Sequence, residues 1–302
     1  MPMAKIPYNK PPLTYEQQIQ QLQERKLIIN NVPRAKHLLE SISYYRLSGY
    51  WYPMLIDKKN HVFKPNSYFQ SAFQLYSFDR ELRVLVIREL EKLEVSVRAK
   101  LIYVISHSHG SFWYDNSSLF RNHINHAKSL GNLETEYLRS DEEFISAFKD
   151  KYTNSLPPSW MLLEITSFGT LSFLYSNLKP GRTKREIANY FGLNDRTFSS
   201  WLHSIVYLRN LCAHHSRLWN KTMSIQPVKP KRTTKIWLEN DDIANNKVYY
   251  ILSMMLYLMQ TINPDNSIVK RLTALFEKYP NVHLAAMGFP TNWKNETLWG
   301  IK

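Results

Sequence analysis

Apolar residues recur at three- and four-residue spacing along most of this chain, which is the spacing of helical faces. The clearest run covers residues 67–106 and predicts one long helix. Its apolar positions are Phe69, Phe73, Tyr76, Val86, Leu90, Leu93, Val97, Leu101 and Val104. Strand-like alternation does not persist for long, so the pattern predicts an all-α fold with a long central helix.

Capping residues and breakers delimit shorter helices around the long one. Thr14 can cap a helix over residues 15–27, and Pro33 suits the first turn of a second helix that ends near Gly49. Further helices are expected over 140–152, 159–167, 169–178, 183–191, 194–214, 246–262 and 266–279, with residues 111–135 mixed.

A turn-rich connector, residues 57–66, separates the first helices from the long one and has room for a short strand pair. We therefore expect a helical N-terminal extension over residues 1–60. Residues 61–302 are expected to form the main helical domain.

The stretch YLRNLCAHHSRLWN, residues 207–220, places polar chemistry at the end of a helix that is apolar on one side. On a helical projection, the apolar residues of this helix fall within an arc of roughly 160° that should face the core. Arg209 lies near the middle of that arc. Asn210 and His214 lie one turn apart to one side of it, and His215 lies on the other flank.

A guanidinium on a buried face is costly unless something compensates its charge. One interpretation is an internal ion pair between Arg209 and Glu94 or Glu164. The other is that this face borders a cleft or a second chain where an anionic substrate binds. An ideal helix also sets Arg209 and His214 about 140° apart, so one small site would need a kinked helix end or a partner subunit.

The net charge of +14, spread along the chain, favours an anionic partner, of which nucleic acid is the commonest. The single cysteine, Cys212, excludes a disulfide within one chain and fits a reducing, cytoplasmic setting. The longest apolar stretch, residues 248–262, is short for a membrane span, so we expect a core helix there and no membrane association.

Two histidine pairs could suggest a metal, namely His107 with His109 and His123 with His126. Neither pair has the companion ligands of a zinc site, so no metal and no other cofactor is expected.

Four stretches together resemble a known group of proteins. Arg209, followed by His214, resembles the Arg-x4–6-His motif of HEPN ribonucleases, and RNLCAHHSRLWN resembles the Abi-like, AbiD/AbiF group of bacterial abortive-infection proteins. The other stretches that resemble this group are YRLSGY at 45–50, FDRELR at 78–83 with Glu94 and Arg98 beyond it, and MGFP at 287–290 with Trp293.

The resemblance implies a HEPN-type helical bundle and a metal-independent endoribonuclease toxin of a phage-defence system. It implies a homodimer in which two motifs face each other across a cleft. By this resemblance Arg209 and His214 are catalytic and Asn210 takes the polar second position. His215 also satisfies the spacing, so the choice of histidine stays open, although His214 shares a face with Asn210.

These residue types suit RNA cleavage by the neighbouring 2′-hydroxyl, which leaves a 2′,3′-cyclic phosphate. Histidine titrates in the range needed to take a proton from that hydroxyl and to give one to the leaving oxygen. An arginine fork can stabilise the negative charge that gathers on the pentavalent phosphate.

Several polar residues near the motif have two interpretations. Arg217 and Asn220 are candidates for phosphate contacts or for bracing the histidines, and otherwise are ordinary residues after a helix. Arg80 and Arg83 are further candidates for RNA binding.

Glu94 and Arg98 are spaced i,i+4 on the long helix. They form either an intrahelical pair worth about 0.3 kcal/mol or a support in which Glu94 orients Arg209 or a histidine. We favour the structural role.

Competing hypotheses remain. Residues 185–202 resemble a helix-turn-helix, which would indicate a DNA-binding regulator, but their second helix is apolar on its core arc and runs on toward His214. Another hypothesis is a HEPN protein that binds RNA or a partner without cleaving. The aromatic residues Tyr44, Tyr45, Tyr50, Trp51 and Tyr52 can stack on RNA bases, although we expect them to pack between the N-terminal helices and the long helix.

A toxin must be restrained until infection. The expected partners are therefore RNA as substrate, and an antitoxin that is either a protein or an inhibitory small RNA.

Overall fold

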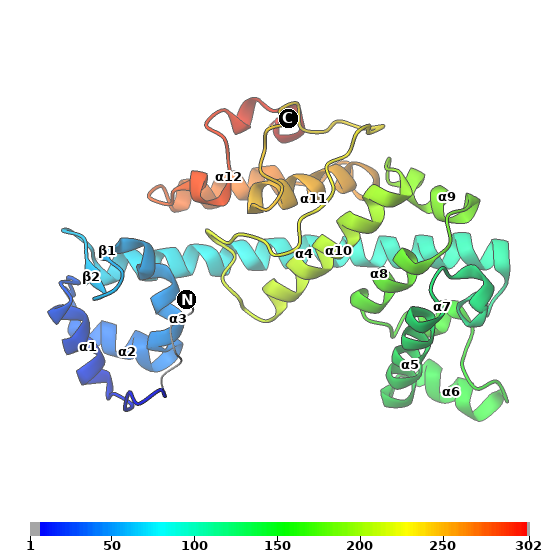
Figure 1. Ribbon diagram of the computed structural model, residues 1–302, viewed down its shortest axis with the longest axis horizontal. Coiled ribbons are helices and arrows are strands. Elements are labelled where there is room, and N and C mark those ends of the chain that lie inside the picture. Colours follow the sequence, from blue (N-terminus) through cyan, green and yellow to red (C-terminus); the bar gives the residue numbers. More distant parts are fainter. Residues whose placement is uncertain (1–6, 301–302) are drawn as a thin grey trace. The chain divides into compact units, whose positions relative to one another are not determined.

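The computed structural model describes residues 7–300, whose regular structure is almost entirely helical. The helices are α1 (Tyr15–Glu24), α2 (Val32–Ile42), α3 (Tyr44–Trp51), α4 (Phe69–His109), α5 (His123–Arg139), α6 (Glu143–Lys151), α7 (Ser159–Leu162), α8 (Phe168–Asn177), α9 (Arg182–Tyr190), α10 (Asp195–Ala213), α11 (Val248–Ile262) and α12 (Ile268–Lys278). Strands β1 (Leu55–Asp57) and β2 (Val62–Phe63) pair antiparallel. The predicted all-α fold with a long central helix is confirmed, since α4 has 41 residues (Figure 1).

The chain divides into two compact units, here called unit 1 and unit 2. Unit 1 ends at Glu81 and unit 2 begins at Leu82, so that α4 contributes to both. The boundary expected at residue 60 falls in the turn of the β1–β2 hairpin, and unit 1 takes in the whole hairpin and the start of α4.

Local capping chemistry sets the helices of unit 1. Thr14 Oγ1 accepts from the Gln17 amide at 3.3 Å and Gln17 Oε1 accepts from the Thr14 amide at 2.8 Å, which is a capping box. The single helix expected over residues 33–49 is wrong. Ser43 has a φ of +77°, which interrupts the helix, and its Oγ accepts from the Arg46 amide at 3.3 Å to start α3.

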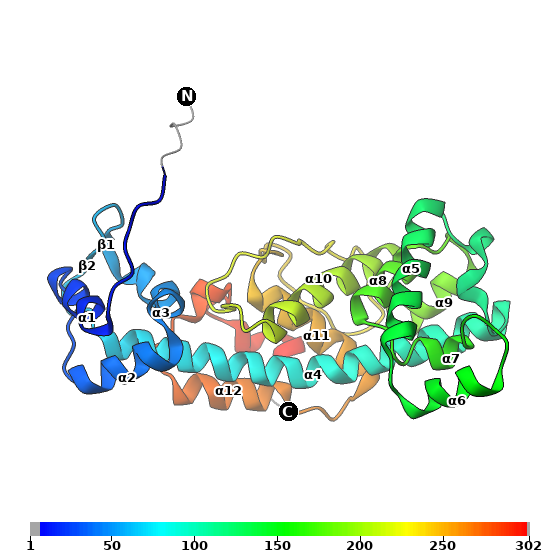
Figure 2. The same ribbon diagram turned by 90° about the horizontal axis from the view of Figure 1, so that it is seen from below.

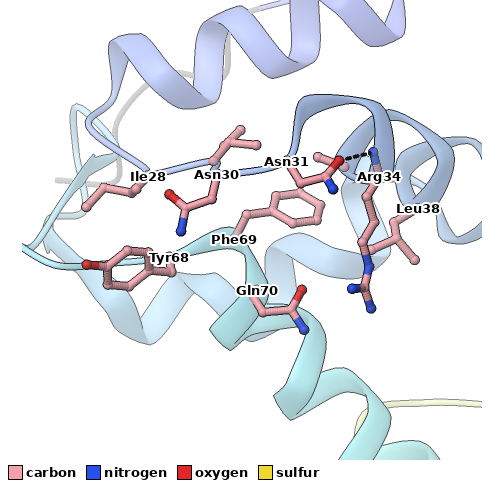
Figure 3. Close-up of a pocket in the computed structure, with 10 residues that line it drawn as sticks. Ile28, Asn30, Asn31, Arg34, Leu38, Tyr68, Phe69 and Gln70 are labelled. Atoms are coloured by element: carbon pink, nitrogen blue, oxygen red, sulfur yellow. Dashed lines mark hydrogen bonds between the residues drawn. The ribbon is translucent and has the colours of Figure 1, made fainter.

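Backbone hydrogen bonds tie the start of α4 to the turn between α1 and α2. The Ile28 amide donates to the Ser67 carbonyl at 2.9 Å, and the Phe69 amide donates to the Ile28 carbonyl at 3.0 Å. Figure 3 shows the small pocket beside this tie, where Asn31 Oδ1 accepts from the Arg34 amide at 2.9 Å and caps α2. The N-terminal helices are thereby anchored to the beginning of the long helix.

Helix α10 lies in the core of unit 2, where it packs on α8, α9 and α11 (Figures 1 and 2). Asn194, where this helix was expected to begin, starts it by accepting from the Thr197 amide at 2.8 Å. The apolar residues of the predicted core arc are buried from Phe198 to Cys212, whereas Ala213 is half-buried. Helix α11 is buried throughout residues 248–259, which confirms the core helix expected there.

Helix α5 is longer than the sequence predicted. Residues 111–135 were expected to be mixed, but α5 begins at His123 and continues to Arg139. It covers 17 residues, and Ser140, expected to start the next helix, is its C-cap instead. Its buried stripe consists of His126, Ser129, Leu133 and Tyr137. Two of these residues are polar, and they obscured the helical period.

A buried lysine clamps the C-terminal end of α8 to α9. Lys184 Nζ donates to the carbonyls of Ser176 at 2.9 Å and Leu178 at 3.0 Å, and lies 5.2 Å from the centroid of the Tyr175 ring. A helix end leaves such carbonyls unpaired, so the ammonium satisfies them. Burial lowers the pKa of Lys184 to about 8. The clamp stabilises the two helices that flank α10.

We predict that Lys184→Met changes how stability depends on pH between pH 8 and pH 10.5. The pKa of Lys184 is about 8 in the folded protein, against 10.5 for an ordinary lysine, so the unfolded chain binds more protons in this window. The free energy of unfolding therefore rises with pH through the window for the wild type, relative to Lys184→Met. Melting temperatures of both proteins across this range check it. A difference that stays constant with pH contradicts the prediction.

Candidate functional site

Helix α10 ends inside the motif, and His214 is its C-cap. The backbone of His214 is still close to helical, with φ −86° and ψ 12°, and its amide donates to the Asn210 carbonyl at 2.9 Å. Both side chains are exposed. His214 therefore lies one helical turn beyond Asn210.

His215 turns the chain sharply away from the helix. Its φ is +54°, its amide donates to the Cys212 carbonyl at 3.1 Å, and the Ser216 amide donates to the Leu211 carbonyl at 2.9 Å. These two bonds are the pair that defines a Schellman motif. Its left-handed position usually holds glycine, and a side chain there costs roughly 1–2 kcal/mol. We call residues 214–216 the histidine turn.

Buried neighbours hold the histidine turn in place. Arg83, on α4, is 5% exposed, and its Nη1 donates to the Ser216 carbonyl at 3.3 Å. Leu218 and Trp219 are buried directly after the turn. Arg83 was a candidate RNA contact, but its burial places it behind the turn as a support. The other candidate on this helix, Arg80, is exposed and belongs to unit 1.

Arg209 lies at a groove of about 330 Å³ between α4 and the end of α10. Glu91, Glu94 and Glu164 line this groove together with apolar side chains, and no histidine lines it. The side chain of Arg209 is 42% exposed. Although Arg209 lies on the arc that faces the core, its long stem carries the guanidinium out to the groove.

Glu94 contacts two arginines at once. Its Oε2 lies 3.8 Å from Arg209 Nε, which is an ion-pair distance rather than a hydrogen bond. Its Oε1 accepts from Arg98 Nη2 at 2.9 Å. The ion pair and the cleft, which the sequence offered as alternatives, are thus both present at Arg209.

Arg98 is a structural residue at this site. It is 9% exposed and donates to the carbonyls of Leu163 at 2.8 Å, Thr166 at 3.0 Å and Glu164. These carbonyls follow α7, where a helix end would otherwise leave acceptors unpaired. Arg98 therefore fixes one wall of the groove and holds the Glu94 carboxylate.

The two polar residues that continue the motif lie beyond the histidine turn. Arg217 and Asn220 are both half-buried, and Asn220 has a φ of +51°. Sequence reasoning left their role open between phosphate contact and bracing.

A basic segment that the sequence could not place follows the motif. Residues 221–235, here called the basic strap, contain five basic residues and no acidic one, and the next acid is Glu239. The strap lies along α10, because Trp201 Nε1 donates to the Val228 carbonyl at 2.9 Å and the Val228 amide donates to Ser200 Oγ at 2.9 Å. Its exposed cations are Lys229, Lys231 and Arg232. Irregular segments of this length are uncommon in a compact domain and are usually functional loops or linkers.

His126, a member of one of the two histidine pairs, has structural surroundings. His126 is buried, its Nε2 lies 2.7 Å from the Tyr114 carbonyl, and its ring stacks on Phe120 at 4.2 Å. Within residues 7–300 no group of three or more His, Cys, Asp or Glu side chains could hold a metal ion. None of the helices in that range combines the length and apolar character needed to cross a bilayer.

A protein-family model described as Abi-like protein matches residues 37–220. The match includes α4, the groove, Arg209 and the histidine turn, and it ends just before the basic strap. No curated protein and no solved structure matches the chain. Since this family model matches more than half of the chain, the chain belongs to the Abi-like protein family.

Proposed function

We propose that this protein is a metal-independent endoribonuclease toxin of a bacterial abortive-infection system, with Arg209, Asn210 and His214 as its catalytic residues. The observation that carries the proposal is the histidine turn. It holds exposed imidazoles on a firmly anchored backbone, beside a helix that presents Arg209 to a groove. Family membership supports the role in abortive infection.

The proposed reaction needs two proton transfers and one charged intermediate. A histidine takes the proton of the 2′-hydroxyl as its oxygen attacks phosphorus, and an acid gives a proton to the departing 5′-oxygen. Arg209 stabilises the extra negative charge on the phosphorane. The bond from phosphorus to the 5′-oxygen breaks, which leaves a 2′,3′-cyclic phosphate and a 5′-hydroxyl.

In this proposal Glu94 and Arg98 are positioning residues for Arg209. Glu94 balances the guanidinium in the absence of substrate, and its second oxygen is held by Arg98. The Arg209 pair is long and partly exposed, so it is weak and a phosphate can compete for the guanidinium.

A second copy of the chain completes the proposed site. The groove beside Arg209 is lined by no histidine, and α4 carries an exposed apolar stripe there, with Val84 at 63%, Ile87 at 36% and Val95 at 59%. Apolar stripes of this kind suit a symmetric contact between two subunits. A homodimer built on this stripe would bring the histidine turn of one protomer toward Arg209 of its partner.

Charge and placement favour RNA over duplex DNA as the ligand. The basic strap places its exposed cations beside the N-terminal half of α10, and the charge of +14 suits a polyanion. The alternative of a helix-turn-helix regulator needs α10 to enter a groove of DNA. Ten of the 19 residues of α10 are buried and the strap covers part of its outer side, which argues against that role.

A restraining antitoxin, either a protein or a small RNA, completes the proposal.

Replacing either catalytic residue should abolish RNA cleavage. We predict that Arg209→Ala and His214→Ala each lower the cleavage rate by about a hundredfold or more, because each removes a group that acts in the transition state. His203→Ala is the matched control, since His203 is an exposed histidine of the same helix. Cleavage of a labelled RNA and growth arrest on expression measure the effect. Wild-type activity in both variants, with the fold intact by circular dichroism, would sink the site assignment.

His215→Gly separates the two histidines. Glycine adopts the left-handed backbone of the turn readily, so the variant should keep the fold and gain stability of about 1 kcal/mol. We predict that it retains cleavage, because His214 performs the proton transfer. The melting temperature and the cleavage rate are measured together. A stable variant that no longer cleaves transfers the catalytic role to His215.

A further inference from the structure

Unit 1 contains a pocket of about 450 Å³ between the N-terminal arm, the end of α1, α3 and the β1–β2 hairpin. We call it the aromatic pocket, because six of its lining residues are aromatic. These are Tyr8, Tyr44, Tyr45, Trp51, Tyr52 and Phe63. Its volume lies in the range of roughly 300–1,000 Å³ that is typical of small-ligand sites.

The aromatic residues divide into a buried floor and an exposed rim. Trp51 and Phe63 are 4% and 2% exposed, and Tyr44 packs edge-on against Trp51 with ring centroids 5.1 Å apart. Tyr45 is 87% exposed and Tyr52 is 46% exposed. The expectation that the aromatic residues from Tyr44 to Tyr52 pack between the N-terminal helices and the long helix is therefore wrong for the two rim tyrosines.

Tyr50 lies between Tyr45 and Tyr52 in the sequence but does not line the pocket, because the fold buries it. It is 2% exposed, and its hydroxyl donates to the buried carboxylate of Asp79 at 2.6 Å. The rings of Tyr45 and Tyr52, by contrast, keep large exposed areas at the mouth of a pocket. Neighbouring exposed rings of this kind are typical of a binding site.

The charge of the aromatic pocket is positive. Lys10, Arg25 and His61 line it, and no acidic residue does. Lys58, which does not line the pocket, has its Nζ 5.4 Å from the centroid of the Tyr52 ring. This balance of charge disfavours cationic ligands and favours a ligand that carries negative charge next to a flat ring.

Asp57, the carboxylate of the β1–β2 hairpin, does not line the pocket and is hydrogen-bonded within its own turn. Asp57 accepts from the amides of Lys59 at 2.8 Å and Asn60 at 3.1 Å, and these bonds, with the Asn60 side chain, lower the pKa of Asp57. The carboxylate therefore serves the hairpin turn, and it is absent from the pocket lining.

We propose that the aromatic pocket binds unpaired nucleotides of an RNA, with the bases stacked on Tyr45 and Tyr52 and the phosphates neutralised by the basic residues. A base supplies a flat face for each ring and its phosphate supplies the charge, so a nucleotide matches both features of the lining. The site holds RNA independently of any cleavage, and thus adds an RNA-binding function in unit 1 to the function proposed for unit 2.

The test measures RNA binding in the full chain carrying His214→Ala, so that the probe stays intact. The probes are a fluorescein-labelled oligouridylate and an abasic oligomer with the same number of phosphates. Fluorescence anisotropy is recorded at elevated salt, which suppresses binding that depends on phosphate charge alone. Tyr45→Ala/Tyr52→Ala is the variant. Tyr103→Ala/Tyr152→Ala is the control, because these tyrosines of unit 2 are 59% and 50% exposed.

The double variant at the pocket should bind oligouridylate about tenfold more weakly or worse, while the control binds normally. The abasic probe should bind weakly to both proteins, with no difference between them. Equal affinity of the pocket variant and the control for oligouridylate overturns the proposal. The proposal is also overturned if binding of a proline-rich peptide is lost in Tyr45→Ala/Tyr52→Ala while binding of RNA is unchanged. Because binding is measured without cleavage, these outcomes are separate from a failure of the catalytic proposal.

Discussion

The left-handed backbone at His215 is the constraint on which the candidate site depends. A histidine takes that conformation only where its surroundings compensate the strain, and here the two Schellman hydrogen bonds, the Arg83 guanidinium and the buried Leu218 and Trp219 do so. The same turn ends α10 at Ala213, which leaves His214 at the helix end and sends the chain into the basic strap. The positions of His214, His215 and the chain that follows them depend on that single turn.

A second set of contacts links the long helix to the motif. Glu94 joins Arg98 to Arg209, and Arg98 in turn binds the backbone that follows α7, so three segments meet at one carboxylate. A charged group at such a point is costly unless it is paired, which explains why the groove carries both signs of charge. In the proposed reaction, Glu94 positions the Arg209 guanidinium through a weak ion pair, which a phosphate can replace.

The sequence predicted those features that neighbouring residues determine. The long helix, the cap at Thr14 and the start of α10 near Asn194 followed from spacing and residue type. The break at Ser43 and the length of α5 were missed, because a positive φ at serine and a buried stripe with polar members leave no periodic signal. The burial of Arg83 and the course of the basic strap along α10 could not be predicted either, since both depend on contacts between distant segments.

The chemistry of the product ends tests the central claim most directly. The full-length protein is incubated with RNA in the presence of EDTA, and the termini of the fragments are identified by mass spectrometry. The account predicts cleavage without a divalent metal, with 2′,3′-cyclic phosphates and 5′-hydroxyls, because the histidines act on the neighbouring 2′-hydroxyl. Fragments with 5′-phosphates and 3′-hydroxyls, formed only when a divalent metal is supplied, would contradict it.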